Sequence, residues 1–159
     1  MVFKIKDCRG YSESFYKNVF STLSDFQKEK IIKLKDEKDK KLSLLAIYLI
    51  AEHTRTLPKN IKYINRKPTI DNSYISITHK YPYVGIAVSD SPIGIDLEIN
   101  RDLDEQTIKY LKARDSKDAL IKWTRFEAEY KSSLENQKKI TTVILENDLI
   151  ITICQKAES

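Results

Sequence analysis

The chain of 159 residues holds 28 Lys and Arg against 23 Asp and Glu, for a formal net charge of +5, and 41% of its residues are hydrophobic. This length supports one core without disulfide or metal staples, and Cys8 and Cys154 lack CxxC or Cys/His spacing, so we expect reduced thiols and no structural metal. The longest apolar run, LLAIYLI at 44–50 with Ala51 after it, is far short of the roughly 20 residues needed to span a bilayer, so we expect a cytoplasmic protein without membrane contact. With only three glycines in the chain, we expect no Gly-rich phosphate-binding loop.

The first half of the chain predicts a strand, then helices, then a hairpin. The first segment alternates apolar and polar residues, and Ser24 with Gln27 forms a capping-box pattern that opens a helix. The expected elements are a strand at 2–6, helices at 24–35 and 39–55, and paired strands at 74–78 and 83–89.

The second half repeats this order of elements. The expected elements are a strand at 93–99, helices at 104–113 and 116–134, and paired strands at 141–146 and 149–154. The pattern predicts an α+β protein made of two similar strand-helices-hairpin halves, residues 1–92 and 93–159. Residues 1–93 carry 17 basic and 10 acidic side chains, whereas 94–159 carry 11 and 13, so the excess positive charge belongs to the first half.

The strand IGIDLEI gives the first chemical signal. Its isoleucines and leucine share one face, so Asp96 and Glu98 project together from the other face, about 6.6 Å apart along the strand. Both carboxylates can approach one hard cation. An ordinary amphipathic strand with a polar outer face is the alternative.

The helix that contains WTRFEAEYK gives the second signal. If Trp123 marks the centre of the buried stripe, Phe126 and Tyr130 lie in the stripe, Glu127 lies inside it, and Lys131 lies at its border. A carboxylate facing the core needs compensation. Two interpretations remain open, namely a structural Glu127–Lys131 pair and a metal site in which Glu127 joins the two strand carboxylates.

The two segments, in this order, resemble the paired signature of the 4′-phosphopantetheinyl transferases, which modify carrier proteins with coenzyme A. Upstream, RKPTI, YISITHK and KKLSLLAIYLI resemble further motifs of that family, so the similarity covers residues 40–131. Because the Gly-Ile-Asp strand is central in the chain, the larger Sfp-type branch is the better match. That branch implies a monomer whose two halves are related by pseudo-two-fold symmetry.

The resemblance implies a role for each matched residue. The second half would carry the Mg²⁺ ligands Asp96, Glu98 and Glu127, together with Lys131 facing the released phosphate. The first half would bind coenzyme A through Lys67, Thr78, His79 and Ser43. Arg66 and Phe126 depart from the family pattern, where glycine and lysine are usual.

The implied reaction transfers 4′-phosphopantetheine from coenzyme A to a serine of an apo acyl carrier protein, and releases 3′,5′-ADP. Glu127 would take the serine proton, or would act only as a metal ligand. The alternative from another class is a noncatalytic module of the same fold that binds coenzyme A or a carrier protein. Nucleic-acid binding by the basic half is a weaker alternative, because no reading helix or basic-aromatic motif accompanies the charge.

Overall fold

The computed structural model describes residues 1–158. The helices are α1 (Glu13–Ser21), α2 (Asp25–Lys33), α3 (Glu37–Thr54), α4 (Glu105–Tyr110) and α5 (Ser116–Ser132), with short 3-10 turns η1 (Cys8–Gly10) and η2 (Pro58–Asn60). The strands are β1 (Val2–Asp7), β2 (Lys62–Ile64), β3 (Lys67–Thr69), β4 (Tyr74–Lys80), β5 (Tyr83–Ser89), β6 (Ile93–Ile99), β7 (Lys138–Ile144) and β8 (Leu149–Lys156). Within this range no helix is both long enough and apolar enough to cross a bilayer.

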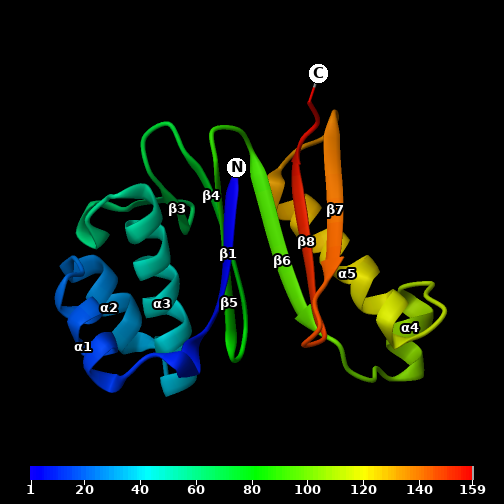
Figure 1. Cartoon of the computed structure of the whole chain (residues 1–159), viewed down its shortest axis with the longest axis horizontal. Helices are drawn as coiled ribbons and strands as arrows, with labels where there is room; N and C mark the ends of the chain where they lie inside the picture. The colour runs from blue at the N-terminus through cyan, green and yellow to red at the C-terminus, as the bar shows by residue number, and fades with distance from the viewer. Residues whose placement is uncertain (159) are drawn as a thin grey trace.

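Two three-stranded antiparallel sheets form the centre of the molecule, with strand orders β1-β5-β4 and β6-β8-β7 (Figure 1). In each sheet the second strand of the hairpin lies between the other two, so both halves have the same strand order. Each sheet takes its strands from one side of residue 93. The expected α+β class is therefore confirmed, and so is the repeated order of strand, helices and hairpin.

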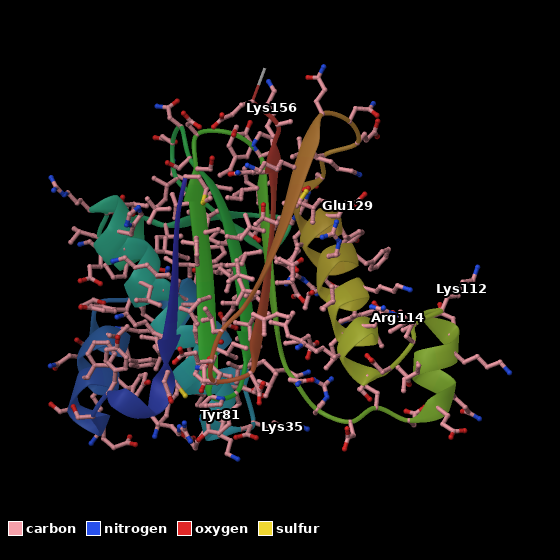
Figure 2. All side chains as sticks on the ribbon, turned by 45° about the vertical axis from the view of Figure 1, so that its right-hand side comes forward. Lys35, Tyr81, Lys112, Arg114, Glu129 and Lys156 are labelled. Carbon is pink, nitrogen blue, oxygen red and sulfur yellow. The ribbon has the colours of Figure 1, made fainter. Side chains whose placement is uncertain are left out.

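The two sheets face each other, and helices cover their outer faces. Helix α3 lies against the first sheet, with α1 and α2 packed on α3, and α5 lies against the second sheet (Figure 1). Strand β5 shows the alternation that this requires, because Ile86 packs toward the helices and Ala87 packs between the sheets. Side chains fill the spaces between these layers (Figure 2).

Local sequence signals explain most of the element boundaries. Ser24 and Gln27 form the expected capping box at the start of α2. Helix α1 was not predicted, although Ser12 caps it by accepting a hydrogen bond from the Phe15 amide. The β2-β3 hairpin was not predicted either; its turn places Asn65 and Arg66 at φ values of 50° and 67° without a glycine.

Candidate functional site

Strand β6 presents its two carboxylates as the alternation predicts. Ile95 and Leu97 lie in the core between the sheets, whereas Gly94, Asp96 and Glu98 lie on the face covered by α5. Both carboxylate residues are buried, with 6% and 5% of their surface exposed. The alternative of a solvated polar face is therefore wrong.

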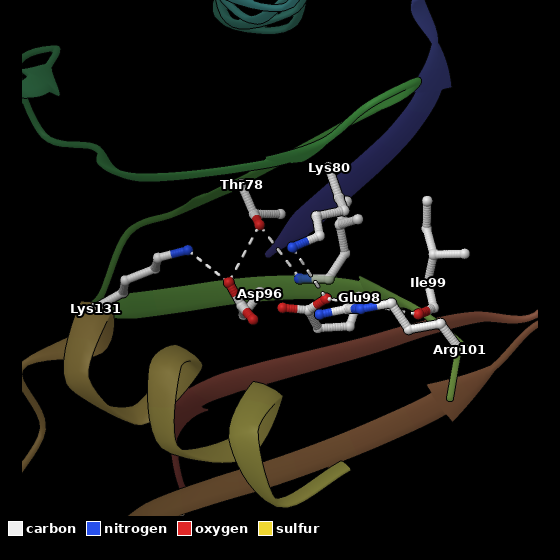
Figure 3. Close-up of polar contacts among 8 residues, drawn as sticks. Thr78, Lys80, Asp96, Glu98, Ile99, Arg101 and Lys131 are labelled. Carbon is white, nitrogen blue, oxygen red and sulfur yellow. Dashed lines mark hydrogen bonds and ion pairs between the residues drawn. The ribbon is translucent and has the colours of Figure 1, made fainter. Parts of the chain in front are cut away.

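Asp96 receives hydrogen bonds from both halves of the molecule. The Lys131 ammonium of α5 donates to its Oδ1 at 2.7 Å, and the Thr78 hydroxyl of β4 donates to the same oxygen at 3.2 Å (Figure 3). Its Oδ2 is buried without a hydrogen-bond partner. Burial raises the pKa of Asp96, and the nearby ammonium of Lys131 opposes that rise.

Glu98 is compensated by two cations that the sequence analysis did not single out. Arg101 donates to its Oε2 at 2.6 Å, and the Lys80 ammonium lies 3.4 Å from the same oxygen (Figure 3). Arg101 lies two residues after the end of β6, and Lys80 is the last residue of β4. Both halves of the chain thus contribute to this carboxylate as well.

The expected buried face of α5 is wrong for its aromatic side chains. Trp123, Phe126 and Tyr130 are 38%, 60% and 74% exposed. The buried residues of the helix are Ala119, Leu120, Thr124, Ala128 and Ser132. The physical reason is the close approach of α5 to β6. A Cβ on Gly94 would lie 1.9 Å from the Ala128 carbonyl oxygen, so no large side chain fits at this contact.

Glu127 consequently lies at the border of the buried face and is only partly buried. No ion pair found within residues 1–158 includes it, so the structural Glu127–Lys131 pair is absent there, and Lys131 pairs with Asp96 instead. Among the described residues no three Asp, Glu, His or Cys side chains form a metal-binding group, so Glu127 is not gathered with Asp96 and Glu98.

The donor chemistry on β6 nevertheless fits Mg²⁺. This ion prefers oxygen ligands and usually takes one or two carboxylates, with water and substrate phosphates in the remaining positions. The partnerless Oδ2 of Asp96 is such a donor, and Glu98 lies two residues away on the same face. These two carboxylates are the residues that would hold the ion.

A cavity of about 300 Å³ lies in the first half, between α2, α3 and the strands β3 and β4. It brings together two of the predicted coenzyme A residues, Ser43 and His79, and adds Lys30 and Arg66. Most of its wall is apolar, including Ile31, Leu34, Ala46, Ile47, Pro68 and Ile77. Apolar walls with cations suit a flat heteroaromatic group that carries phosphate.

The structure separates Lys67 and Thr78 from this cavity. Lys67 lies beside α5, where its ammonium donates to the Lys131 carbonyl oxygen at 3.4 Å. Its chain neighbour Arg66 lines the cavity, so β3 and its turn link the cavity to the carboxylate site. The run of cations from 55 to 67 was the available sequence signal for Arg66, whereas Lys30 had none.

His79 stands at the wall of the cavity with part of its side chain in solvent. The surrounding protein lowers the pKa of His79 below 6.5 by removing water from the ring, and the cations of Lys131 and Lys80 add to this effect, while Asp39 opposes it. The imidazole is therefore mainly neutral at pH 7, with one ring nitrogen able to donate and the other able to accept a hydrogen bond.

Comparison with known proteins adds no constraint on function. The chain matches no family model, and no curated protein is significantly similar to it.

Proposed function

We propose that this protein is a 4′-phosphopantetheinyl transferase of the Sfp type, with the pseudo-symmetric fold of that branch. One observation carries the proposal: the Asp96–Lys131 pair, with a buried and partnerless carboxylate oxygen on Asp96, lies where the two halves meet. Lys67 reaches the same helix end from the strand that adjoins the cavity. Two sheets with the same strand order support this assignment.

The adenosine 3′-phosphate and the pyrophosphate of coenzyme A would each have a counterpart in this arrangement. The cavity with Ser43, His79 and Arg66 would hold the adenosine 3′-phosphate end. The pyrophosphate would then extend along β3 toward Lys67 and Lys131. Mg²⁺ bound by Asp96 and Glu98 would neutralise charge that develops on the pyrophosphate.

The chain's own residues supply positioning and charge for the transfer. A carrier serine oxygen attacks the β-phosphorus, the bond to the bridging pyrophosphate oxygen breaks, and 3′,5′-ADP leaves with the bond's electron pair. Lys131 would stabilise the leaving phosphate, and Glu127, at the partly exposed border of α5, would accept the serine proton. The acceptor is an apo acyl carrier protein or a related carrier domain, and the basic first half favours an acidic one.

A second candidate is a noncatalytic module that binds coenzyme A or a carrier protein. The observation favouring it is that Lys131, Lys80 and Arg101 already neutralise the carboxylates of β6. In this case both carboxylates would be structural, and ligand binding would depend on the first-half cavity alone.

One assay distinguishes the two candidates. The protein is incubated with an apo carrier, coenzyme A and Mg²⁺, and the intact mass of the carrier is measured. The transferase yields a phosphopantetheine adduct that Asp96→Asn and Glu127→Gln abolish, whereas the matched control Glu129→Gln, on the same helix and paired with Lys138, retains it. Binding of coenzyme A without any adduct supports the module and rejects the transferase.

A further inference from the structure

Two hydroxyl groups of β4 join the first sheet to the edge of the second. Strand β6 pairs with β8 on one side only, so its other side has free amides. The Ile95 amide donates to the Ser76 hydroxyl at 3.0 Å, and the Leu97 amide donates to the Thr78 hydroxyl at 3.2 Å. All of these groups are buried, so the two hydroxyls satisfy amides that would otherwise have no partner.

Thr78 has a second contact that Ser76 lacks. Its hydroxyl proton is donated to Asp96 Oδ1, so one oxygen both accepts from β6 and donates to the carboxylate. With Lys131 also on Oδ1, that oxygen has two donors, whereas Oδ2 has none. The carboxylate is thereby held in one orientation, in which Oδ2 has no hydrogen-bond partner.

We propose that Thr78 is a positioning residue for the cation site, and that its hydroxyl fixes Asp96 so that Oδ2 stays free to bind Mg²⁺. This inference rests on the proposed function, because it takes Asp96 as a metal ligand. It differs from the phosphate contact that the family resemblance implies for Thr78. The side chain is only 4% exposed, and both its donor and its acceptor are engaged within the protein.

The methyl group of Thr78 has a separate role in packing. A Cβ built on Gly85 would lie 2.9 Å from Thr78 Cγ2, so the methyl occupies the space above that glycine. Serine at this position keeps the hydroxyl and loses the methyl, whereas valine keeps a methyl and loses the hydroxyl. These two variants separate packing from positioning.

The test measures metal binding in the absence of substrate. Mn²⁺, which takes the same oxygen ligands as Mg²⁺, is titrated alone into each full-length protein and followed by electron paramagnetic resonance, with melting temperature measured in parallel. We expect Thr78→Val to bind Mn²⁺ about ten- to a hundredfold more weakly, as is usual when a partner of a metal ligand is lost. Thr78→Ser should bind like the wild type.

Ser76→Ala is the matched control, because it removes a hydroxyl from the same joint without touching Asp96. It should lower the melting temperature and leave Mn²⁺ affinity unchanged. Equal affinity in Thr78→Val and wild type, or an equal loss in Ser76→Ala, overturns the positioning role while the transferase proposal stands. A wild type that binds no Mn²⁺ overturns the metal site on which both depend. If Thr78→Val does not fold, Thr78→Ala decides between the same outcomes.

Discussion

Gly94 is where α5 crosses β6, and replacing it with alanine tests how close this contact must be. The added Cβ would lie 1.9 Å from the Ala128 carbonyl oxygen and 2.6 Å from the Ser132 amide nitrogen. Both are backbone atoms of a regular helix, so neither can turn aside as a side chain would. The helix must therefore move outward by about 1 Å or more, because protein interiors are close-packed.

We expect Gly94→Ala to lower the free energy of unfolding by about 3 kcal/mol, at the upper end of the usual range for overpacking. For a chain of this size the melting temperature should fall by about 6–12 °C. The displacement also carries Lys131 away from Asp96, and a misplacement of about 1 Å near reacting groups can cost a hundredfold in rate. Transfer activity measured below the melting transition should therefore fall as well.

The control is Gly10→Ala, because a Cβ at that exposed position meets no atom within 4 Å. Thermal melts and carrier-mass assays on the two variants are compared at equal concentration. A Gly94→Ala protein that melts within about 1 °C of the wild type, far less than the expected shift, would show that α5 does not contact β6 closely at this glycine.

Three further predictions concern individual side chains. Lys131→Met should destabilise the metal-free protein by about 3 kcal/mol, because Asp96 is left as an uncompensated buried charge. Added Mg²⁺ should restore part of the lost melting temperature. A Lys131→Met protein with the melting temperature of the wild type would contradict the pairing. Arg66→Ala should weaken the binding of coenzyme A, measured by calorimetry, by about 1.5–3 kcal/mol, because a charge-assisted bond to the 3′-phosphate is lost. The binding of dephospho-coenzyme A should weaken much less. Equal losses of binding free energy for the two ligands would exclude that contact. The folded protein lowers the pKa of His79 below 6.5, so the unfolded chain takes up the proton first as the pH falls, and the free energy of unfolding decreases below about pH 6.5. Urea denaturation at pH 7.5 and 5.5 should show a smaller decrease in this free energy for His79→Gln than for the wild type. Identical decreases would contradict the pKa shift.

Local patterns were sufficient for much of the fold. The alternation of β6 and the capping box of α2 depend on residues a few positions apart, and the structure confirms both. The prediction of the buried face of α5 was wrong because it took the large aromatic side chains to point inward, as they usually do. Here the close contact at Gly94, some thirty residues earlier, admits only small side chains.

The partners of the candidate site illustrate the same limit. Asp96 and Glu98 were recognisable from strand periodicity, but their cations come from a strand, a loop and a helix with no shared spacing: Lys80, Arg101 and Lys131. Which ammonium reaches which carboxylate is decided by tertiary packing. For this reason neither of the two interpretations of Glu127 and Lys131 included the pair that the structure shows, which is Lys131 with Asp96.

The strand orders also determine when each half can be completed during synthesis. In both sheets the central strand is the last to be made, so β5 inserts between β1 and β4, and β8 between β6 and β7. Until Leu149–Lys156 has left the ribosome, the strand that carries Asp96 has no backbone partner and depends on two hydroxyls of the first half. A nonsense codon before Leu149 would therefore eliminate the carboxylate site, although every residue proposed to bind metal or substrate had already been translated.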